Sequence, residues 1–291
     1  MPVGSVRKGI TIAAVSVVLV AAGVFAIVFV THLGSGPLSP YCSVDAAGGA
    51  PGDSSSSDTT SPTHFSFTSE QAGNAATIAA VGMKLGLPPH AVTIALATAW
   101  QESKLINLTS GDRDSAGLFQ QRPSQGWGTY DQVTDPVHAA SAFYQHLTKL
   151  SGWDQLPVTE AAQKVQHSAT PDAYAQWESE ARAMASAFTG ETQALLSCHN
   201  LAVAPTKQDI ASAADQEWGT SAVSGAHDPT QGWAIGSWLV AKATQFGIDS
   251  VTVGSRTWTA ASGSWTAPAA SESASDGGTV SLHLVQITPS S

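Results

Sequence analysis

The stretch that decides the fold is residues 89–103, which read PHAVTIALATAWQES. A proline suits the first turn of a helix, and the apolar residues that follow it lie on nearly every face of that helix. A helix that is apolar all round is buried, so this segment is expected to lie at the centre of a helical domain. It ends at Gln101, Glu102 and Ser103, which place a carboxylate where the apolar helix stops.

Helical patterns continue on both sides of this segment. Thr68 and Gln71 form a capping box before one helix, and Asp135 is an N-cap before another. From Pro171 onward, aromatic and small apolar residues recur every three or four positions. Residues 65–200 are therefore expected to form a helical domain.

The pattern changes after residue 200. Residues 233–246 keep a helical period, whereas 251–253, 257–259 and 280–286 alternate as short strands do. Residues 201–291 are therefore expected to form a small α+β domain, appended to the helical one.

The N-terminal part predicts a membrane anchor. Residues 9–31 carry no charge and are mostly apolar, which is long enough for one helix across a bilayer. Arg7 and Lys8 precede this run, and the next basic residue is Lys84, so residues 1–8 are expected in the cytoplasm and the bulk of the chain outside.

A cleaved signal peptide is the alternative for the same segment. Its apolar core is usually only about 7–15 residues and ends near an A-x-A-like site, which is not found before Cys42. Residues 32–64 are rich in Gly, Ser, Thr and Pro and are expected to be an extracytoplasmic flexible linker.

The chain contains two cysteines, Cys42 and Cys198. In the oxidising compartment that this topology implies, we expect them to form a disulfide bond. Free or intermolecular thiols are the alternative.

Composition argues against several functions. The net charge of -10, with 12 Lys and Arg residues, leaves no basic surface for nucleic acid. The sequence has no His-Glu-x-x-His motif or Cys/His cluster for zinc, and no Gly-x-Ser-x-Gly elbow. We therefore expect no metal and no cofactor.

Glu102 is the strongest candidate for chemistry. Burial against apolar neighbours raises the pKa of a carboxyl group, so that it keeps its proton nearer neutral pH and acts as a general acid. A short polar loop then leads to Gly117-Leu118-Phe119-Gln120. These residues permit close backbone approach, stacking of a sugar face on Phe119, and hydrogen bonding of an N-acetyl group to Gln120.

Glu102-Ser103 followed by Gly117-Leu118-Phe119-Gln120 resembles the Glu-Ser and Gly-Leu-Met-Gln motifs of the lysozyme-like superfamily, in its lytic transglycosylase branch, with Phe119 in the Met position. The resemblance implies that Glu102 protonates a glycosidic oxygen of peptidoglycan and then acts as a base, while Ser103 steadies its carboxylate. The expected substrate-binding residues are Ser103, Gly117, Leu118, Phe119, Gln120, Arg122, Trp127 and Tyr144.

A second carboxylate, which most glycosidases need, is less clear. Asp112 and Asp114 are the nearest candidates, although both also suit a turn. Phe143-Tyr144-Gln145 stands where the family has Ala-Tyr-Asn. Hydrolysis and transglycosylation therefore both stay open.

The expected fold class is mainly α: a lysozyme-like helical domain after a single N-terminal transmembrane helix, plus a small C-terminal α+β appendage. The expected function is cleavage of peptidoglycan glycan strands at the outer face of the cell membrane. The alternative is a catalytically inactive module that binds glycan or acts as a scaffold. The expected partners are glycan strands and, through residues 9–31, the lipid bilayer.

Overall fold

The computed structural model describes residues 39–45, 64–168, 170–266 and 277–286. From Pro40 onward these residues belong to one compact unit. The expected membrane anchor, residues 9–31, and most of the expected linker lie outside the described residues. Within the described ranges, no helix is both long enough and apolar enough to cross a bilayer.

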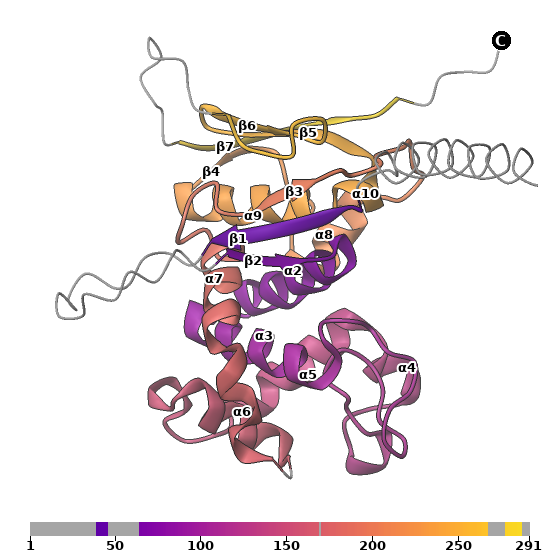
Figure 1. Cartoon of the computed structure of the whole chain (residues 1–291), viewed down its shortest axis with the longest axis vertical. Helices are drawn as coiled ribbons and strands as arrows, with labels where there is room; N and C mark the ends of the chain where they lie inside the picture. Colours follow the sequence, from indigo (N-terminus) through magenta and orange to yellow (C-terminus); the bar gives the residue numbers. More distant parts are fainter. Residues whose placement is uncertain (1–38, 46–63, 169, 267–276, 287–291) are drawn as a thin grey trace, which may run out of the picture. The chain divides into compact units, whose positions relative to one another are not determined.

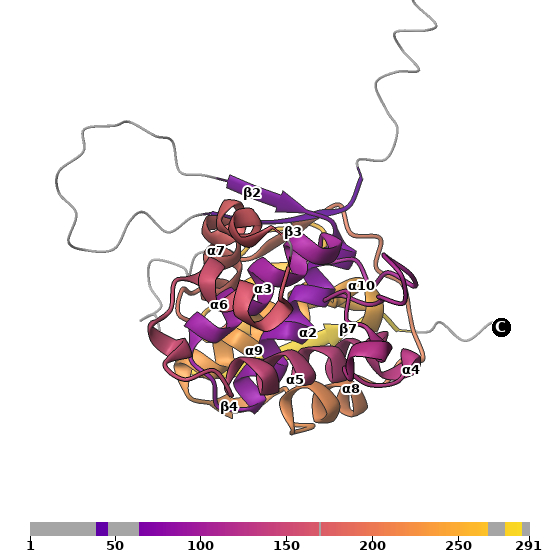
Figure 2. The same cartoon turned by 90° about the horizontal axis from the view of Figure 1, so that it is seen from below.

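Two helices form the centre of the unit. Helix α2 (Ser69–Lys84) begins with the predicted capping box, in which the Thr68 side chain accepts from the Gln71 backbone and the Gln71 side chain accepts in return. Helix α3 (Pro89–Ser103) begins at the predicted proline and is buried along most of its length. Figure 2 shows α3 with α2, α5, α6 and α7 packed around it.

Shorter helices and 3₁₀ turns complete this part of the chain. They are η1 (Pro123–Gln125), α4 (Tyr130–Val133), α5 (Pro136–Leu147), η2 (Trp153–Gln155), α6 (Val158–Gln166), η3 (Pro171–Trp177) and α7 (Glu178–Phe188). The Asp135 side chain accepts a hydrogen bond from the His138 backbone, which confirms the predicted N-cap of α5.

A three-stranded antiparallel sheet joins both ends of this helical region. Its strands are β1 (Tyr41–Asp45), β2 (His64–Phe67) and β3 (Ser197–His199), in the order β2-β1-β3. Cys42 lies directly opposite Cys198 in the β1–β3 register, and the two form a buried disulfide bond. The predicted disulfide is therefore confirmed.

Cys198→Ser is expected to lower the free energy of unfolding by about 5 kcal/mol, because the bond closes a loop between residues separated by 156 positions. Thermal unfolding with and without a reductant measures this effect. Reduction should lower the Tm of the wild type but not that of the Cys42→Ser/Cys198→Ser double variant. Equal Tm values for reduced and oxidised wild type would show that the disulfide adds no stability.

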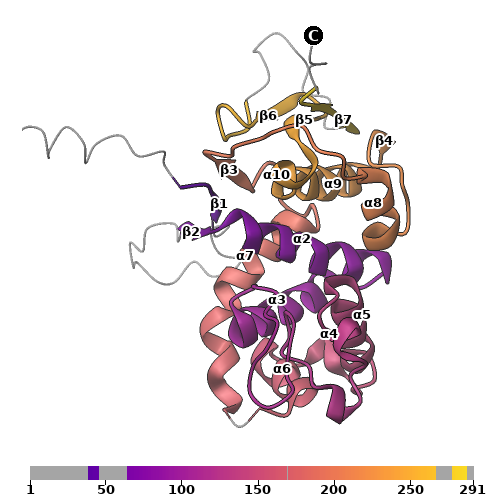
Figure 3. The same ribbon diagram turned by 90° about the vertical axis from the view of Figure 1, so that its right-hand side faces the viewer.

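The C-terminal part contains helices and a second antiparallel sheet. Its elements are α8 (Ile210–Trp218), β4 (Gly225–His227), α9 (Pro229–Ala241), α10 (Ala243–Phe246), β5 (Ile248–Val253), β6 (Arg256–Thr259) and β7 (Gly278–Leu284), and the strand order is β4-β7-β5-β6. Strands β5, β6 and β7 lie where the alternating patterns predicted them. Helix α9 is buried between this sheet and α2 (Figures 1 and 3).

The fold class expected from the sequence is wrong. Of the described residues, about 48% are helical and 16% lie in strands, which form two antiparallel sheets, so the protein is α+β rather than mainly α. The β1–β2–β3 sheet was missed because it joins short strands from distant positions. The C-terminal part is no appendage, because α9 buries its apolar surface against α2 within the same compact unit.

Candidate active site

Glu102 lies in the last turn of α3, and polar side chains of α2 fix the chain just after it. Lys104 and Leu105 both adopt positive φ angles, 56° and 57°, which turn the backbone sharply away from the helix. Gln71 donates to the carbonyl of Lys104 at 2.9 Å, and Asn74 donates to that of Leu105 at 2.7 Å. These bonds satisfy the carbonyl groups of the two residues that follow the helix and so fix the turn after Glu102.

Glu102 opens into a cleft of about 350 Å³. The residues that line it are Glu102, Asp112, Ser115, Phe119, Gln120, Arg122, Gln166, His167 and Ser168. Of the predicted site residues, the structure therefore brings Glu102, Asp112, Phe119, Gln120 and Arg122 together around one space. Ser115 and the three residues from α6 onward were not predicted.

The carboxyl group of Glu102 is partly buried and has one strong hydrogen bond. The Tyr174 hydroxyl donates to its Oε1 atom at 2.7 Å. Burial raises the pKa of Glu102 above its ordinary value, and the bond from Tyr174 opposes this only in part. This direction of shift favours the protonated carboxyl group, the form that a general acid needs.

Tyr174 contacts Glu102 but is not among the site residues predicted from the sequence. It comes from η3 and is fully buried, and burial together with the nearby Glu102 raises its pKa, so the phenol stays neutral. Ala173-Tyr174 is the signal that could have indicated this residue. It matches the first two residues of the Ala-Tyr-Asn motif, whereas Phe143-Tyr144 matches only the second.

Ser103 supports the site through the backbone. Its hydroxyl donates to the carbonyl oxygen of Leu118 at 2.7 Å and also lies 3.0 Å from the carbonyl oxygen of Ala99. The Ser103 hydroxyl is therefore directed to the backbone of its own helix and of the following loop rather than to the carboxylate of Glu102. Leu118 itself is fully buried, so it packs in the core and does not face the cleft.

The loop that carries Gln120 is held in one shape. Gly117 has a φ of 79°, and a Cβ at this position would overlap the carbonyl oxygen of Val133, so only glycine fits. The Gln120 side chain donates to the Gly117 carbonyl at 3.1 Å and accepts from the Ser115 hydroxyl at 3.0 Å. Both ends of its amide are thus oriented before any ligand binds.

Phe119 forms the floor of the cleft and is not a stacking platform. Its ring is 1% exposed and stacks on Phe143, with ring centroids 4.8 Å apart. Its carbonyl oxygen accepts a hydrogen bond from Gln166 at 2.9 Å, which ties the loop to the end of α6. A sugar therefore contacts at most the edge of this ring.

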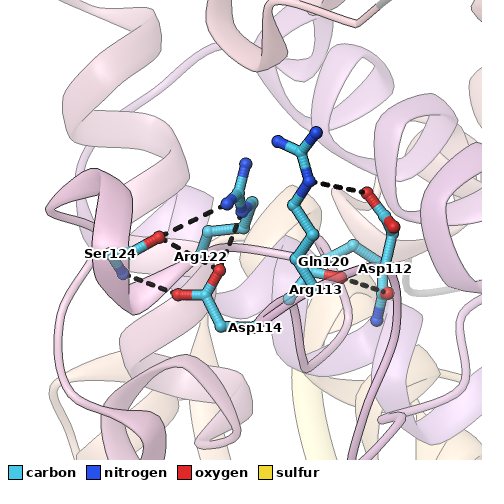
Figure 4. A network of polar contacts seen from close by, with 7 residues as sticks. Asp112, Arg113, Asp114, Gln120, Arg122 and Ser124 are labelled. Carbon is cyan, nitrogen blue, oxygen red and sulfur yellow. Dashed lines mark hydrogen bonds and ion pairs between the residues drawn. The ribbon is translucent and has the colours of Figure 1, made fainter.

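Asp112 and Asp114 differ in exposure and in their hydrogen-bond partners. Asp114 accepts hydrogen bonds from Arg122 Nε at 2.9 Å, from the Ser124 backbone at 2.8 Å and from the Ser124 hydroxyl at 3.0 Å (Figure 4). These bonds, first that from the Ser124 backbone, hold the pKa of Asp114 well below its usual range. Asp114 therefore serves to orient Arg122 and the turn that follows it.

Asp112 remains free for chemistry. Its side chain is 91% exposed, lines the cleft, and has Arg113 as a distant ionic neighbour at 3.8 Å (Figure 4). Of the two carboxylates that the sequence indicated, Asp112 is the one that faces the same space as Glu102.

Trp127 and Tyr144 do not line the cleft. Trp127 stacks on His146, with ring centroids 4.1 Å apart. Tyr144 is fully buried and donates to the carbonyl oxygen of Ile78 in α2 at 3.0 Å. Tyr144 is therefore part of the core, and the tyrosine that bonds to Glu102 is Tyr174, which is itself buried.

Asp114→Asn and Asp112→Asn form a matched pair that separates the two roles. Because the pKa of Asp114 is depressed in the folded state, its charge stabilises the fold above its ordinary pKa of 3.8, and this contribution is lost as the pH falls below that value. Asp114→Asn should therefore lower the Tm at pH 7, with the difference shrinking in acid. Asp112→Asn should leave the Tm unchanged. Equal Tm values for both variants at pH 7 would contradict the assignment.

A search against models of known protein families finds no match, and a search of curated proteins finds no similar sequence.

Proposed function

We propose that this protein cleaves glycosidic bonds in peptidoglycan glycan strands, with Glu102 as the general acid. The observation that carries the proposal is a partly buried carboxyl group, with a raised pKa, that opens into a polar cleft of about 350 Å³. The likeness of Glu102-Ser103 and of Gly117 to Gln120 to the transglycosylase motifs supports the same reaction.

The bond from Tyr174 defines which oxygen of Glu102 carries the proton. A neutral phenol donates, so Oε1 is the acceptor and the acidic proton resides on Oε2. In the proposed reaction, Oε2 gives this proton to the glycosidic oxygen as the bond between that oxygen and the anomeric carbon breaks. The ionised carboxylate, still bound by Tyr174, then takes a proton from the attacking hydroxyl or water.

The second half of the reaction has two routes. Asp112 faces the cleft and is the candidate to stabilise the positive charge that develops on the sugar. In the other route, the acetamide and a hydroxyl of the substrate itself act as nucleophiles, and the product has an anhydro end. The mass of the product end separates the routes, because a hydrolysed end contains one additional water.

The proposal places the cleft outside the cell, beside the wall. Residues 9–31 would anchor the chain in the membrane, and the disulfide between Cys42 and Cys198 suits an oxidising compartment. The neutral, hydroxyl-rich glycan also suits a cleft lined by amide, hydroxyl and balanced charged groups.

Incubation of the full chain with purified peptidoglycan sacculi tests the proposal. Soluble fragments with cleaved glycosidic bonds should appear in the supernatant, and mass spectra should identify their ends. Sedimentation of the protein with the sacculi without any soluble fragments would instead indicate a binding module. Fragments released only by cleavage of peptide bonds would also contradict the proposal.

A further inference from the structure

Two neighbouring side chains at the end of α3 are both bound from η3. Gln101 Oε1 accepts a hydrogen bond from Trp177 Nε1 at 2.7 Å and a longer one from Gln176 Nε2 at 3.3 Å. The next residue, Glu102, accepts from Tyr174 at 2.7 Å. Side-chain hydrogen bonds thus fasten η3 to the turn that carries the proposed acid.

The geometry of a 3₁₀ helix couples these bonds. Such a helix has about three residues per turn, so side chains three positions apart lie on the same edge. Tyr174 and Trp177 therefore face α3 together, and they meet consecutive residues of its last turn. A shift of η3 that breaks one of the bonds must also move the other donor.

Trp177 is itself held in place, which gives its N–H a fixed direction. Its ring lies against Trp100, with centroids 5.9 Å apart, and Lys104 Nζ lies 3.9 Å from its ring centroid. Burial lowers the pKa of Lys104, and Glu180 opposes this shift. These contacts, together with the hydrogen bond from Nε1 to Gln101, set the position of Trp177, and so of η3, against the end of α3.

We propose that Gln101 is a positioning residue: its amide oxygen holds Trp177, and thereby η3, in the register that keeps the Tyr174 hydroxyl on Glu102. The inference rests on the proposed role of Glu102 as the acid. The contact itself can be measured without any turnover, because release of Tyr174 removes a bond that favours the ionised carboxylate and so raises the pKa of Glu102. The other charged or titratable neighbours are Asp112, Arg122 and His167 in the cleft lining and Lys104 over the Trp177 ring, and none of these residues is substituted in the variants below.

The test is a titration of Glu102 by NMR in the full chain, in micelles, with ¹³C-labelled glutamate and the signal assigned by its absence in Glu102→Gln. Gln101→Met keeps the length of the side chain but removes the acceptor, and Trp177→Phe keeps a ring but removes the donor. Both should raise the pKa of Glu102 in the same direction as Tyr174→Phe does. Gln155→Met, at an exposed glutamine in η2, is the matched control and should leave the titration unchanged.

A double variant decides whether Gln101 acts through Tyr174. In Gln101→Met/Tyr174→Phe, the pKa of Glu102 should equal that of Tyr174→Phe alone, because the bond is already absent. If the two shifts add, or if Gln101→Met lowers the Tm but leaves the titration of Glu102 unchanged, the inference is overturned. Trp177→Phe keeps the test valid if Gln101→Met does not fold.

Turnover gives an independent readout. Gln101→Met should lower kcat for glycan release about tenfold and leave KM within about twofold, because it displaces the acid without touching the cleft lining. If the wild type releases no glycan but the titrations couple as described, the proposed function fails and the positioning contact stands. If the wild type is active and the titrations do not couple, the positioning inference fails alone.

Discussion

Glu102→Gln is expected to lower the rate of glycan release by about 10³-fold, within the range that a positioned general acid contributes. The substitution removes the transferable proton but keeps an oxygen that can accept the bond from Tyr174, so the fold should persist. Release of soluble fragments from sacculi, measured by chromatography, gives the rate. Glu178→Gln, at an exposed glutamate of α7, is the matched control and should keep the wild-type rate.

The pH dependence of the wild-type rate of glycan release should follow the titration of Glu102. In the proposed reaction the protonated form of Glu102 is the active one, and burial raises the pKa of this carboxyl group. The rate should therefore be retained above the ordinary pKa of a glutamate and fall as the pH rises through the raised value. A rate that increases steadily across this range, or a Glu102→Gln variant that keeps more than about a tenth of the wild-type rate, would show that Glu102 is not the acid.

Lys242→Met is expected to destabilise the fold by about 3–5 kcal/mol, because it leaves a buried charge without its partner. Lys242 Nζ lies 2.9 Å from Glu217 Oε1 and 2.9 Å from Thr77 Oγ1, and Trp238 Nε1 donates to Glu217 Oε2 at 2.7 Å. The side chains of Lys242 and Glu217 are only 5% and 8% exposed. This network joins α8 and α9 to α2, so its loss weakens the packing between the two parts of the compact unit.

Chemical unfolding of a single and a double variant distinguishes the effect of an unpaired buried charge from the effect of lost packing. Lys242→Met/Glu217→Gln removes both charges and keeps an acceptor for Trp238, so it should recover part of the stability that Lys242→Met loses. Urea midpoints, with the slopes compared, give the free energies. If the single variant lies within about 1 kcal/mol of the wild type, or the double variant is the less stable of the two, the buried pair does not hold these helices together.

Local signals predicted the elements well. The capping box at Thr68 and Gln71, the start of α3 at Pro89 and the N-cap at Asp135 depend on neighbouring residues alone, and the structure contains all three. The alternation in 251–253 and 280–286 likewise needs only one buried face of a sheet, and strands β5 and β7 include residues 251–253 and 280–284. The disulfide was predicted because the chain contains only two cysteines.

Tertiary relations were predicted poorly. Strand β1 pairs with β3 although the two are separated by about half of the chain. The periodicity within a short strand does not indicate which other strand it pairs with. Tyr144 was assigned to the cleft because Phe143-Tyr144-Gln145 stands where the resembled family has Ala-Tyr-Asn, but its hydroxyl donates to the carbonyl oxygen of Ile78 in the core. Tyr174 contacts Glu102 from η3, a 3₁₀ helix that the sequence pattern does not distinguish from an α-helix.

The aspartates show the same limit within the site. The sequence predicts both Asp112 and Asp114 either as turn residues or as a second carboxylate. Their hydrogen bonds differ because the Ser124 backbone N–H and Arg122 lie next to Asp114. Only in the folded loop does Asp114 accept hydrogen bonds from these donors while Asp112 faces the cleft.

The most direct test of the central claim compares the wild type and Glu102→Gln on the same sacculi, with the soluble products identified by mass spectrometry. If Glu102 is the acid, the wild type should release disaccharide-containing fragments with anhydro or reducing ends, and Glu102→Gln should release almost none. Equal amounts of the same fragments from both proteins, or no glycan fragments from the wild type, would contradict it.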